Sequence, residues 1–457
     1  MSRVVVVGGG IAGLAAAHRL REIGPDLEIV LLERAERLGG KIRTLPFVGQ
    51  PIETGAETFL MRDGPAQSAA LALAQRLGLG DALVHPAPVP AALAIDGALV
   101  AIPGGTLMGI PADPGALTGV AAVSGEDTDS GRPLLRPGED VAVGALVRSR
   151  LGDEVVARLV DPLLGGVYAG RADTLSLQAT MPGLHRSALA CNTLGAAVRE
   201  ALRAAPRPAG TPAFATVHGG LSQLVEAVAA ASRARVELGQ TVRGLTRVGS
   251  GWRVRTGAAG RESALDADAV VLAVPGAPAG RLLSSVDADA AAAVGRLEYA
   301  SMALVTLALP ADTALPELSG FLVPAEQGYA VKAATFFTTK WPHLRRAAVI
   351  VRASLGRHGS DEDVLALTDA ALIDRVRCEL PRLVGAPVPA PSKARVNRWG
   401  GGLPQYGVGH TARVAAARAG LPPSLELAGA AYDGVGIAAC VRSGEAAAQR
   451  VREALPA

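Results

Sequence analysis

Residues Val4-Val-Val-Val-Gly-Gly-Gly-Ile-Ala-Gly13, followed later by Glu33, decide the fold. Four consecutive valines predict a strand that is buried on both faces of a parallel sheet. Gly8, Gly10 and Gly13 fit the G-x-G-x-x-G pattern that follows the first strand of a dinucleotide-binding fold. Gly8 makes the tight turn, Gly10 lets the backbone approach a pyrophosphate, and Gly13 lets the next helix pack close to the strand. The pattern therefore predicts a phosphate-binding turn.

The residues after this turn complete a strand–helix–strand unit. Residues 11–23 predict a helix whose N-terminus points at the pyrophosphate, where free amides and the helix dipole favour an anion. Gly24-Pro25 ends this helix, residues 28–32 predict a second strand, and Glu33 stands at its end. Glu33 follows the last glycine of the turn by twenty residues, the spacing expected of a carboxylate that binds a ribose hydroxyl. The pattern alone leaves NAD and FAD open.

A second glycine loop follows Glu33 directly. Residues 34–44 contain Gly39, Gly40 and Lys41 together with further basic side chains. This loop resembles the flavin fingerprint of the amine oxidase and protoporphyrinogen oxidase superfamily, whereas a nicotinamide enzyme has no need of it. The resemblance implies FAD as the cofactor.

The bulk composition bears on the class of function. The chain has 457 residues, of which 49% are hydrophobic, so it is long enough to form two or three lobes. Aromatic residues make up 3%, and the net charge of +3 is spread along the chain, which argues against a nucleic-acid-binding protein. Neither a C-x-x-C nor an H-E-x-x-H motif occurs, so we expect no metal site.

Cysteine usage and hydropathy bear on the compartment. Cys191, Cys378 and Cys440 are far apart and odd in number, so we expect free thiols in a reducing cytoplasm. The chain enters a strand at once, which leaves no room for a signal peptide. No run of about 18 apolar residues could span a bilayer, and contact with a membrane surface stays open. We therefore expect a cytoplasmic protein.

The expected fold class is α/β, with a discontinuous Rossmann-like FAD-binding domain, a helical insertion and an α+β substrate lobe. Residues 141–164 predict a helix bent at Pro162, residues 361–380 a helix ended by Pro381, and residues 438–455 a terminal helix. The expected boundaries divide the chain into residues 1–85, the first segment of the FAD-binding domain; 86–212, a helical inserted domain; 213–290, the second segment of the FAD-binding domain; 291–395, a substrate-binding sheet lobe; and 396–457, the last segment of the FAD-binding domain.

The whole chain resembles the FAD-dependent protoporphyrinogen and coproporphyrinogen oxidases, and among them the Gram-positive-type branch. The most specific pieces are residues 161–170, DPLLGGVYAG; Leu175-Ser176; Lys340-Trp341-Pro342; Arg398-Trp399; residues 403–406, LPQY; Gly409-His410; and residues 434–437, GVGI, with Cys440 and Ser443-Gly444. That branch oxidises coproporphyrinogen III to coproporphyrin III with O2 in heme biosynthesis. The resemblance implies a six-electron oxidation, by successive hydride transfers from meso carbons to flavin N5 with release of H2O2.

The resemblance also implies which residues line the flavin. They are Gly8, Gly9, Gly10, Ile11, Ala12 and Gly13 at the pyrophosphate, Glu33 at the ribose, Arg34, Gly40 and Lys41 in the second loop, Gly55, Ala56, Glu57 and Thr58 along the isoalloxazine, Val242 at the adenine, and Trp399, Val435, Gly436 and Ile437 at the closing wall. A helix beginning near Ile437 would direct its free amides at the flavin edge that gains negative charge on reduction. One departure concerns Glu57. Mitochondrial relatives carry an arginine there, so their substrate-carboxylate contact is not carried over.

No catalytic residue is predicted, because a porphyrinogen has weak, doubly activated methylene C–H bonds and the cofactor supplies the chemistry. Coproporphyrinogen carries four propionates, so arginine or lysine side chains should line the mouth of its cavity. Arg62, Arg171 and Lys332 are the candidates, with a solvated surface charge as the alternative for each. Tyr168, within the most specific motif, is a candidate for lining the pocket, with a packed core tyrosine as the alternative.

Three other functions stay open. Protoporphyrinogen oxidation is the sister activity. A flavin amine oxidase usually has an aromatic cage over the flavin, which the low aromatic content disfavours. A flavin-stabilised interaction protein would bind porphyrin without turnover and hand it to a chelatase such as ferrochelatase. Porphyrinogen and O2 are the expected partners, and both a monomer and a homodimer remain open.

Overall fold

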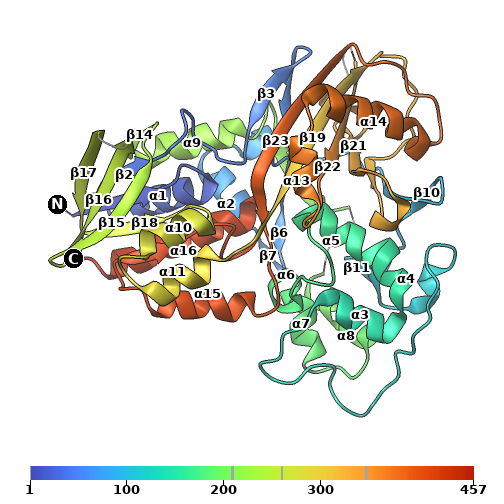
Figure 1. Ribbon diagram of the computed structural model, residues 1–457, viewed down its shortest axis with the longest axis horizontal. Coiled ribbons are helices and arrows are strands. Elements are labelled where there is room, and N and C mark those ends of the chain that lie inside the picture. Colours follow the sequence, from blue (N-terminus) through green and yellow to red (C-terminus); the bar gives the residue numbers. More distant parts are fainter. Residues whose placement is uncertain (1, 207–209, 259–260, 345–347, 457) are drawn as a thin grey trace.

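The computed structural model describes residues 2–206, 210–258, 261–344 and 348–456. Residues 207–209, which the sequence assigns to the inserted domain, lie outside the described residues. Figure 1 shows three regions: a sheet flanked by helices on the left, a larger sheet at the upper right, and a group of helices at the lower right. In this view the labels N and C both stand at the left edge of the first region.

A five-stranded parallel sheet forms the centre of the first region, with strand order β14-β2-β1-β18-β24. Its strands are β1 (Arg3–Val7), β2 (Glu28–Leu32), β14 (Arg235–Glu237), β18 (Ala269–Leu272) and β24 (Leu425–Leu427). Val4 and Val6 pack into one hydrophobic core, whereas Val5 and Val7 pack into another on the opposite face. The prediction of a strand buried on both faces is confirmed.

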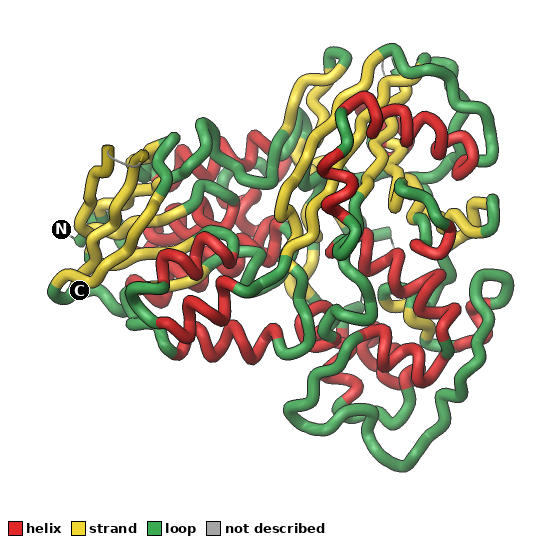
Figure 2. Tube along the Cα trace, viewed as in Figure 1, coloured by secondary structure: helices red, strands yellow, loops and turns green. Residues whose placement is uncertain are grey.

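Further elements cover both faces of this sheet (Figure 2). One face carries α1 (Ile11–Ile23), α2 (Ala69–Arg76), α9 (Ser222–Ser232) and α16 (Ile437–Glu453). The other carries α10 (Gly276–Leu283), α11 (Ala288–Gly295), α15 (His410–Ala419) and an antiparallel sheet of β15 (Val242–Val248), β16 (Gly251–Ala258) and β17 (Arg261–Ala267). Segments from both halves of the chain build this region, which is the discontinuous arrangement that the sequence predicts.

The second region is a seven-stranded sheet with the order β10-β9-β20-β21-β22-β19-β23. Its strands are β9 (Ala91–Ile95), β10 (Ala98–Ala101), β19 (Tyr299–Leu309), β20 (Gly320–Leu322), β21 (Val331–Phe336), β22 (Val349–Leu355) and β23 (Lys393–Pro404). Among the helices that pack against it are α13 (Asp361–Ala366) and α14 (Asp369–Val384). Leu372, Val376 and Leu380 of α14 share a hydrophobic core with the sheet.

Three features of this region differ from the sequence prediction. Strands β9 and β10 lie in the segment assigned to the helical insertion, but β9 pairs in parallel with β20 and so extends the sheet. Strand β23 crosses the expected boundary at residue 396 and pairs with β19. Pro381 lies inside α14 and does not end it. Near a helix C-terminus the missing amide of proline removes a single hydrogen bond, and Gly385, at φ +73°, ends the helix instead.

The third region is helical and has its own hydrophobic core. It contains α3 (Val143–Leu151), α4 (Asp153–Val155), the π-helical turn η3 (Val156–Val160), α5 (Asp161–Tyr168), α6 (Leu177–Thr180), α7 (Pro182–Ala188) and α8 (Leu194–Ala204). The helix predicted over residues 141–164 is divided. Gly152, at φ +94°, ends α3, and Pro162 stands in the first turn of α5, next to the π-helical turn. Proline and π-helical turns are common sites of helix distortion.

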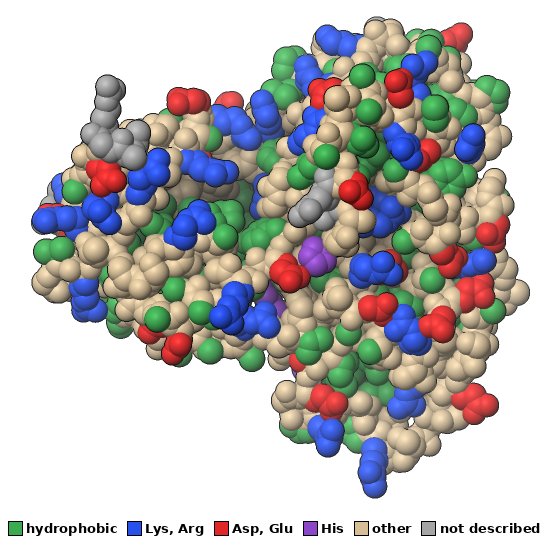
Figure 3. Space-filling view, in the orientation of Figure 1, with side chains coloured by type: hydrophobic (Ala, Val, Ile, Leu, Met, Phe, Trp, Pro, Cys, Tyr) green, Lys and Arg blue, Asp and Glu red, His purple; other side chains and the backbone are tan. Residues whose placement is uncertain are grey.

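Short elements complete the fold. They are β3 (Thr44–Phe47), β4 (Gln50–Glu53), β5 (Phe59–Leu60), β6 (Arg62–Asp63), β7 (Ala66–Gln67), β8 (Leu83–Val84), β11 (Thr106–Leu107), β12 (Ile110–Pro111), β13 (Phe214–Val217), α12 (Phe337–Lys340), and the 3₁₀ turns η1 (Gly80–Ala82), η2 (Pro114–Leu117), η4 (Ala325–Gln327) and η5 (Pro342–Leu344). Among the described residues, no helix combines the length and apolar character needed to cross a membrane. Charges of both signs are interspersed on the face drawn in Figure 3.

Candidate functional site

The predicted phosphate-binding turn lies between the end of β1 and the start of α1. A Cβ on Gly13 would overlap the Gly8 carbonyl oxygen, so glycine is needed for the close approach of α1. A Cβ on Gly10 would meet no atom within 4 Å, so this side of the turn is open. Gly10 is also the N-cap of α1, and no side chain caps the helix. The amides of Ile11 and Ala12 therefore stay available to an anionic group.

Glu33 reaches from the end of β2 to this turn. Its Oε2 accepts a hydrogen bond from the Gly9 amide at 2.6 Å, and its Oε1 accepts one from the Ala35 amide at 2.8 Å. A carboxylate offers about four lone-pair positions, so two remain for the hydroxyls of a ribose. The geometry fits the ribose contact that the sequence predicts.

The second glycine loop lies directly against the first. The Gly39 amide donates to the Gly9 carbonyl at 2.8 Å, and Gly39 pairs with Gly10 as an isolated parallel bridge. The two glycine loops, which are separated in the sequence by α1 and β2, thus form one continuous backbone surface around the open side of Gly10.

A guanidinium that the sequence prediction missed fixes the second loop. Arg37 donates to the carbonyls of Leu38, Gly40 and Ile42 at 3.0, 2.8 and 3.3 Å. These contacts use the fork of donors that arginine presents. Arg34, the predicted contact in this loop, has an exposed side chain. Its role toward a cofactor stays a prediction.

Three sequence-distant pieces meet beyond the second loop. The Ala56 amide donates to the Lys41 carbonyl at 3.0 Å, and Trp399 Nε1 donates to the Thr54 carbonyl at 2.7 Å. A Cβ on Gly55 would overlap the Lys41 carbonyl oxygen and lie 2.9 Å from the Trp399 ring, so no larger residue fits there. Burial lowers the pKa of the Lys41 ammonium. The structure therefore brings together Lys41, Gly55 and Trp399, which the sequence predicts to share one site.

The N-terminus of α16 borders the same cluster. Gly436, at φ +106°, is its N-cap, and a Cβ there would meet no atom within 4 Å. Further along α16, a Cβ on Gly444 would overlap the Ala12 carbonyl oxygen, which shows how closely α16 packs on α1. Burial raises the pKa of the Cys440 thiol to about 11, and the neighbouring Lys41 opposes this rise. Helix α16 thus begins beside the second loop, as α1 begins beside the first.

An ionic network holds the turn that precedes α16. Arg418 donates to both carboxylate oxygens of Asp433, at 2.7 and 2.6 Å, and the Ser443 hydroxyl also donates to Asp433. The Ser443 oxygen accepts a hydrogen bond from the Gly429 amide at 2.8 Å. Burial opposes ionisation of Asp433, but Arg418 outweighs it and lowers the pKa of the carboxyl. This network, which the sequence prediction missed, fixes the position at which α16 starts.

Glu57 lies where the first region meets the seven-stranded sheet. Its carboxylate accepts hydrogen bonds from Lys340 Nζ at 2.7 Å, Arg352 Nη2 at 2.6 Å and Trp341 Nε1 at 2.9 Å. Burial opposes ionisation, but the charges of Lys340 and Arg352 lower the pKa of Glu57 to about 2. Arg352 also donates to the Glu53 carbonyl at 2.9 Å. The sheet therefore holds the loop that the sequence places along the isoalloxazine.

Glu53, four residues before Glu57, is also buried, but its pKa is shifted in the opposite direction. Its Oε1 accepts hydrogen bonds from the Leu221 amide at 2.7 Å and from Thr44 Oγ1 at 2.9 Å. Burial is the main influence on this group and raises the pKa of Glu53 to about 7. Glu53 at the end of β4 and Glu57 in the loop that follows thus have pKa values displaced in opposite directions.

Comparison with known proteins decides the family. Residues 11–452 match the family described as flavin containing amine oxidoreductase. The chain belongs to this family. It is similar to proteins named coproporphyrinogen III oxidase from Mycobacterium tuberculosis (39% identical, covering 99% of this chain and 98% of the relative) and from Bacillus subtilis (32%, covering 97% and 96%). It is also similar to human protoporphyrinogen oxidase (29%, covering 98% of each).

Solved structures agree with this assignment. A crystal structure from Exiguobacterium sp. 255-15, provisionally assigned as a protoporphyrinogen oxidase, has a TM-score of 0.85 and 32% identity, and the match covers 99% of both chains. Putrescine oxidase has a TM-score of 0.70 at 18% identity, which shows a shared fold. The protein is therefore a flavin-containing oxidoreductase. The open turn at Gly10 and the uncapped amides of α1 fit the phosphate of a flavin nucleotide.

In this flavin-containing oxidoreductase, Tyr168 lies at the end of α5. Its ring centroid is 5.7 Å from that of Tyr406, and its carbonyl accepts a hydrogen bond from Gln405 Nε2 at 2.8 Å. Burial raises the pKa of Tyr168 to about 12. Tyr406 stacks on His410, with 4.2 Å between their ring centroids. The Tyr406 hydroxyl donates a hydrogen bond to the carbonyl of Ala430, which lies in the segment that leads to α16. Aromatic packing therefore links α5 to the α16 side of the site.

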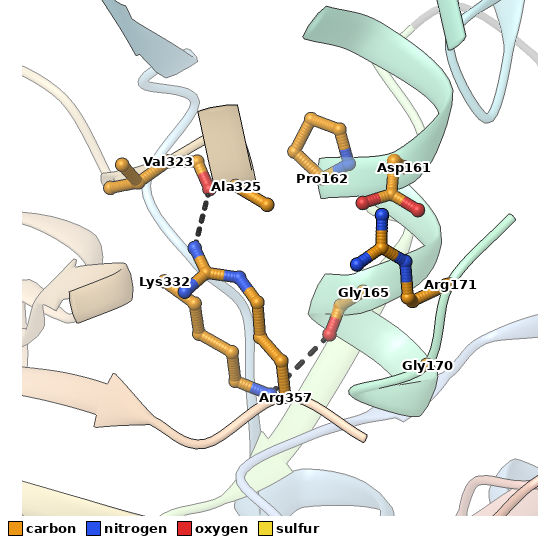
Figure 4. Close-up of a pocket in the computed structure, with 9 residues that line it drawn as sticks. All are labelled: Asp161, Pro162, Gly165, Gly170, Arg171, Val323, Ala325, Lys332 and Arg357. Atoms are coloured by element: carbon orange, nitrogen blue, oxygen red, sulfur yellow. Dashed lines mark hydrogen bonds between the residues drawn. The ribbon is translucent and has the colours of Figure 1, made fainter. Parts of the chain in front are cut away.

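The structure brings together two of the three predicted cations. Lys332 on β21 and Arg171 after α5 line one cavity, and Arg357, which the sequence prediction missed, lines it as well (Figure 4). Lys332 is 6% exposed, so the alternative of a solvated surface charge is wrong for this residue, whereas Arg171 is exposed. Arg62 lies in β6, where its guanidinium donates to the Pro65 carbonyl. Arg62 is not among the residues that line this cavity.

Proposed function

We propose that this oxidoreductase binds FAD and oxidises coproporphyrinogen III to coproporphyrin III in heme biosynthesis, with O2 as the oxidant. The observation that carries the proposal is its 39% identity, over nearly the whole chain, to a coproporphyrinogen III oxidase. The meeting of the two glycine loops with the starts of α1 and α16 supports it. A dinucleotide is favoured because the chain provides both a pyrophosphate turn and a ribose carboxylate, Glu33.

The proposed FAD contacts are those of the family resemblance, and the local geometry supports them. They are residues 8–13, Glu33, Arg34, Gly40, Lys41, residues 55–58, Val242, Trp399 and residues 435–437. The uncapped amides of α1 would hold the pyrophosphate and Glu33 the ribose. The first amides of α16 would face the flavin edge that gains negative charge on reduction.

Bound FAD would supply the two-electron acceptor for each hydride removed from a meso carbon, and O2 would restore its oxidised form with release of H2O2. Three such rounds account for the six electrons lost by the porphyrinogen. The role of the chain is to exclude water and to hold the macrocycle against the cofactor. Tyr168, buried at the end of α5 against Tyr406, is proposed to line the macrocycle cavity.

Anaerobic reduction tests the proposal directly. The purified protein should be yellow, coproporphyrinogen should bleach its flavin absorbance in the absence of O2, and O2 should restore the colour while porphyrin fluorescence appears. A folded protein without flavin, or a flavin that no porphyrinogen bleaches, would overturn the proposal. Bleaching by polyamines in place of porphyrinogens would identify an amine oxidase.

Protoporphyrinogen oxidation is the second candidate. Human protoporphyrinogen oxidase aligns over 98% of both chains. The similar structure from Exiguobacterium is provisionally assigned as a protoporphyrinogen oxidase as well. The ratio of bleaching rates with coproporphyrinogen and protoporphyrinogen separates the two activities. The proposed compartment is the cytoplasm, because Cys191, Cys378 and Cys440 are free thiols, and cell fractionation checks this assignment.

A further inference from the structure

The turn that precedes α16, residues 429–436, lies where three hydrophobic cores of the protein meet. Ala431 and Tyr432 belong to the core on one face of the parallel sheet, and Ala430 packs against the core on the other face. Val435 packs against the core of the helical region. The turn is therefore positioned from several sides before α16 begins.

Three glycines of this turn, Gly429, Gly434 and Gly436, have positive φ angles of +114°, +127° and +106°. Glycine adopts such angles without steric cost, but it is also the residue with the greatest conformational freedom. The sequence of the turn therefore allows its shape without fixing it. Contacts with neighbouring elements have to hold the turn in place.

Two polar groups hold the turn from different regions of the protein. The ionic network around Asp433 holds it from within the first region. Tyr406, whose side chain belongs to the core of the helical region, donates its hydroxyl to the Ala430 carbonyl. Burial raises the pKa of Tyr406, and a hydrogen bond with the Gly434 backbone opposes the rise. Because Tyr406 is 1% exposed, water does not replace its hydroxyl at the turn.

The main chain and the ring of Tyr406 are themselves fixed. The Ser176 amide donates to the Tyr406 carbonyl at 2.7 Å, and the Gly409 amide donates to Asp140 Oδ2 at 2.8 Å, so the helical region holds this segment. The His410 ring stacks on Tyr406, with 4.2 Å between the centroids and 24° between the planes. Burial lowers the pKa of His410 to about 4, so the imidazole is neutral near pH 7. The stack therefore orients the tyrosine without adding a charge.

We propose that Tyr406 is a positioning residue of the flavin site. By binding the Ala430 carbonyl, its hydroxyl fixes the turn from which α16 starts. The first amides of α16 then stay directed at the flavin edge that gains negative charge on reduction, and they stabilise that charge. The proposal rests on the proposed function, which places the flavin at residues 435–437. Tyr406 acts through this backbone and does not touch the reacting atoms.

The midpoint potential of the bound flavin, measured anaerobically against reference dyes, tests this role. Tyr406→Phe keeps the ring and removes the hydroxyl, so the Ala430 carbonyl loses its partner. Less firmly held amides stabilise the reduced flavin less. Its two-electron reduction should become about tenfold less favourable, which is a shift of about 30 mV to more negative potential. At saturating coproporphyrinogen, anaerobic bleaching should slow about tenfold, while the half-saturating concentration stays within about twofold of the wild-type value.

Tyr299→Phe is the matched control. The Tyr299 hydroxyl also bonds to backbone, since it accepts a hydrogen bond from the Gly276 amide at 2.7 Å. This contact lies at the start of α10, on the opposite face of the parallel sheet from α16. The control should keep the wild-type potential even where urea unfolding shows an equal loss of stability. His410→Leu keeps the Tyr406 hydroxyl but removes the stacked ring, so it should shift the potential in the same direction by a smaller amount. This variant keeps the test decisive if Tyr406→Phe does not fold.

The outcomes separate this role from the proposed function. If coproporphyrinogen bleaches the wild type, and Tyr406→Phe has the same potential and bleaching rate, the positioning role is overturned and the proposed function stands. A raised half-saturating concentration with an unchanged potential overturns the role as well, because Tyr406 would then act on the porphyrinogen through its contact with Tyr168. If the wild type holds no flavin, or no porphyrinogen bleaches its flavin, the proposed function is overturned and this role with it.

Discussion

Glu57→Gln should destabilise the folded protein by about 3 kcal/mol. Glutamine keeps the shape and an acceptor for Trp341, but it removes the negative charge that Lys340 and Arg352 share. Losing one partner of a buried ion pair costs about 3–5 kcal/mol, because the remaining charge is uncompensated. The pKa of Glu57 falls from an ordinary 4.5 to about 2, which corresponds to about 3 kcal/mol. Two separate arguments therefore give a similar magnitude.

Glu53→Gln is the matched variant, with the opposite dependence on pH. Burial raises the pKa of Glu53 from 4.5 to about 7, so wild-type stability falls as pH rises from 4.5 through about 7. Glutamine does not titrate, so Glu53→Gln should gain about 2 kcal/mol relative to wild type between about pH 5 and pH 8. The contribution of Glu57 is complete above its unfolded pKa of about 4.5 and is lost only toward pH 2. The stability deficit of Glu57→Gln relative to wild type should therefore stay constant between about pH 5 and pH 8.

Urea unfolding at several pH values, followed by tryptophan fluorescence, measures both effects on the flavin-loaded protein. Glu317→Gln, at an exposed position, controls for the loss of one negative charge. A Glu57→Gln deficit below about 1 kcal/mol at pH 7 would refute the argument from burial. Equally, parallel pH curves for the two variants would show that the two carboxyls do not differ as their surroundings imply.

Three further predictions concern the cofactor side. Gly10→Ala should fold normally yet lose most of its flavin, which the ratio of flavin to protein absorbance measures. Gly13→Ala should lose at least about 1 kcal/mol of stability, measured by urea unfolding, because its Cβ overlaps backbone. Arg37→Lys should weaken flavin binding about tenfold, measured by titrating flavin-stripped protein, because an ammonium cannot donate to three carbonyls in the same geometry. Asp433→Asn should cost about 2 kcal/mol by weakening the pair with Arg418. Because the pKa of Asp433 is lowered in the fold, this difference should shrink as pH falls below about 4.

The sequence predicted those elements whose limits are set by local chemistry. Helix α1 has the predicted bounds, because Gly10 leaves its start open and Gly24-Pro25 stops it. The buried strands of the parallel sheet were predictable from runs of β-branched and aliphatic residues. The need for glycine at positions 13 and 55, which we propose to lie at the cofactor, was also predictable, since backbone approaches backbone there too closely for a side chain.

Features that depend on distant partners were not predictable. Strand β9 joins the second sheet through pairing with β20, which lies more than two hundred residues later in the chain. Arg37, Arg357 and Asp433 carry no motif of their own, and their roles follow from the carbonyls and charges that the fold places beside them. Lys332 was a candidate by charge alone, and its burial against α5 is a tertiary property.

The carboxylate at Glu57 bears on where a substrate anion can bind. The family resemblance implies an arginine at this position in mitochondrial relatives, facing a substrate carboxylate. Here Lys340 and Arg352 converge on one buried carboxylate, which neutralises one of their two positive charges. An arginine in the same place would put a third cation beside two others at low dielectric, and that repulsion would be large. A contact with a substrate carboxylate is therefore not expected at this position, which the buried carboxylate of Glu57 already occupies.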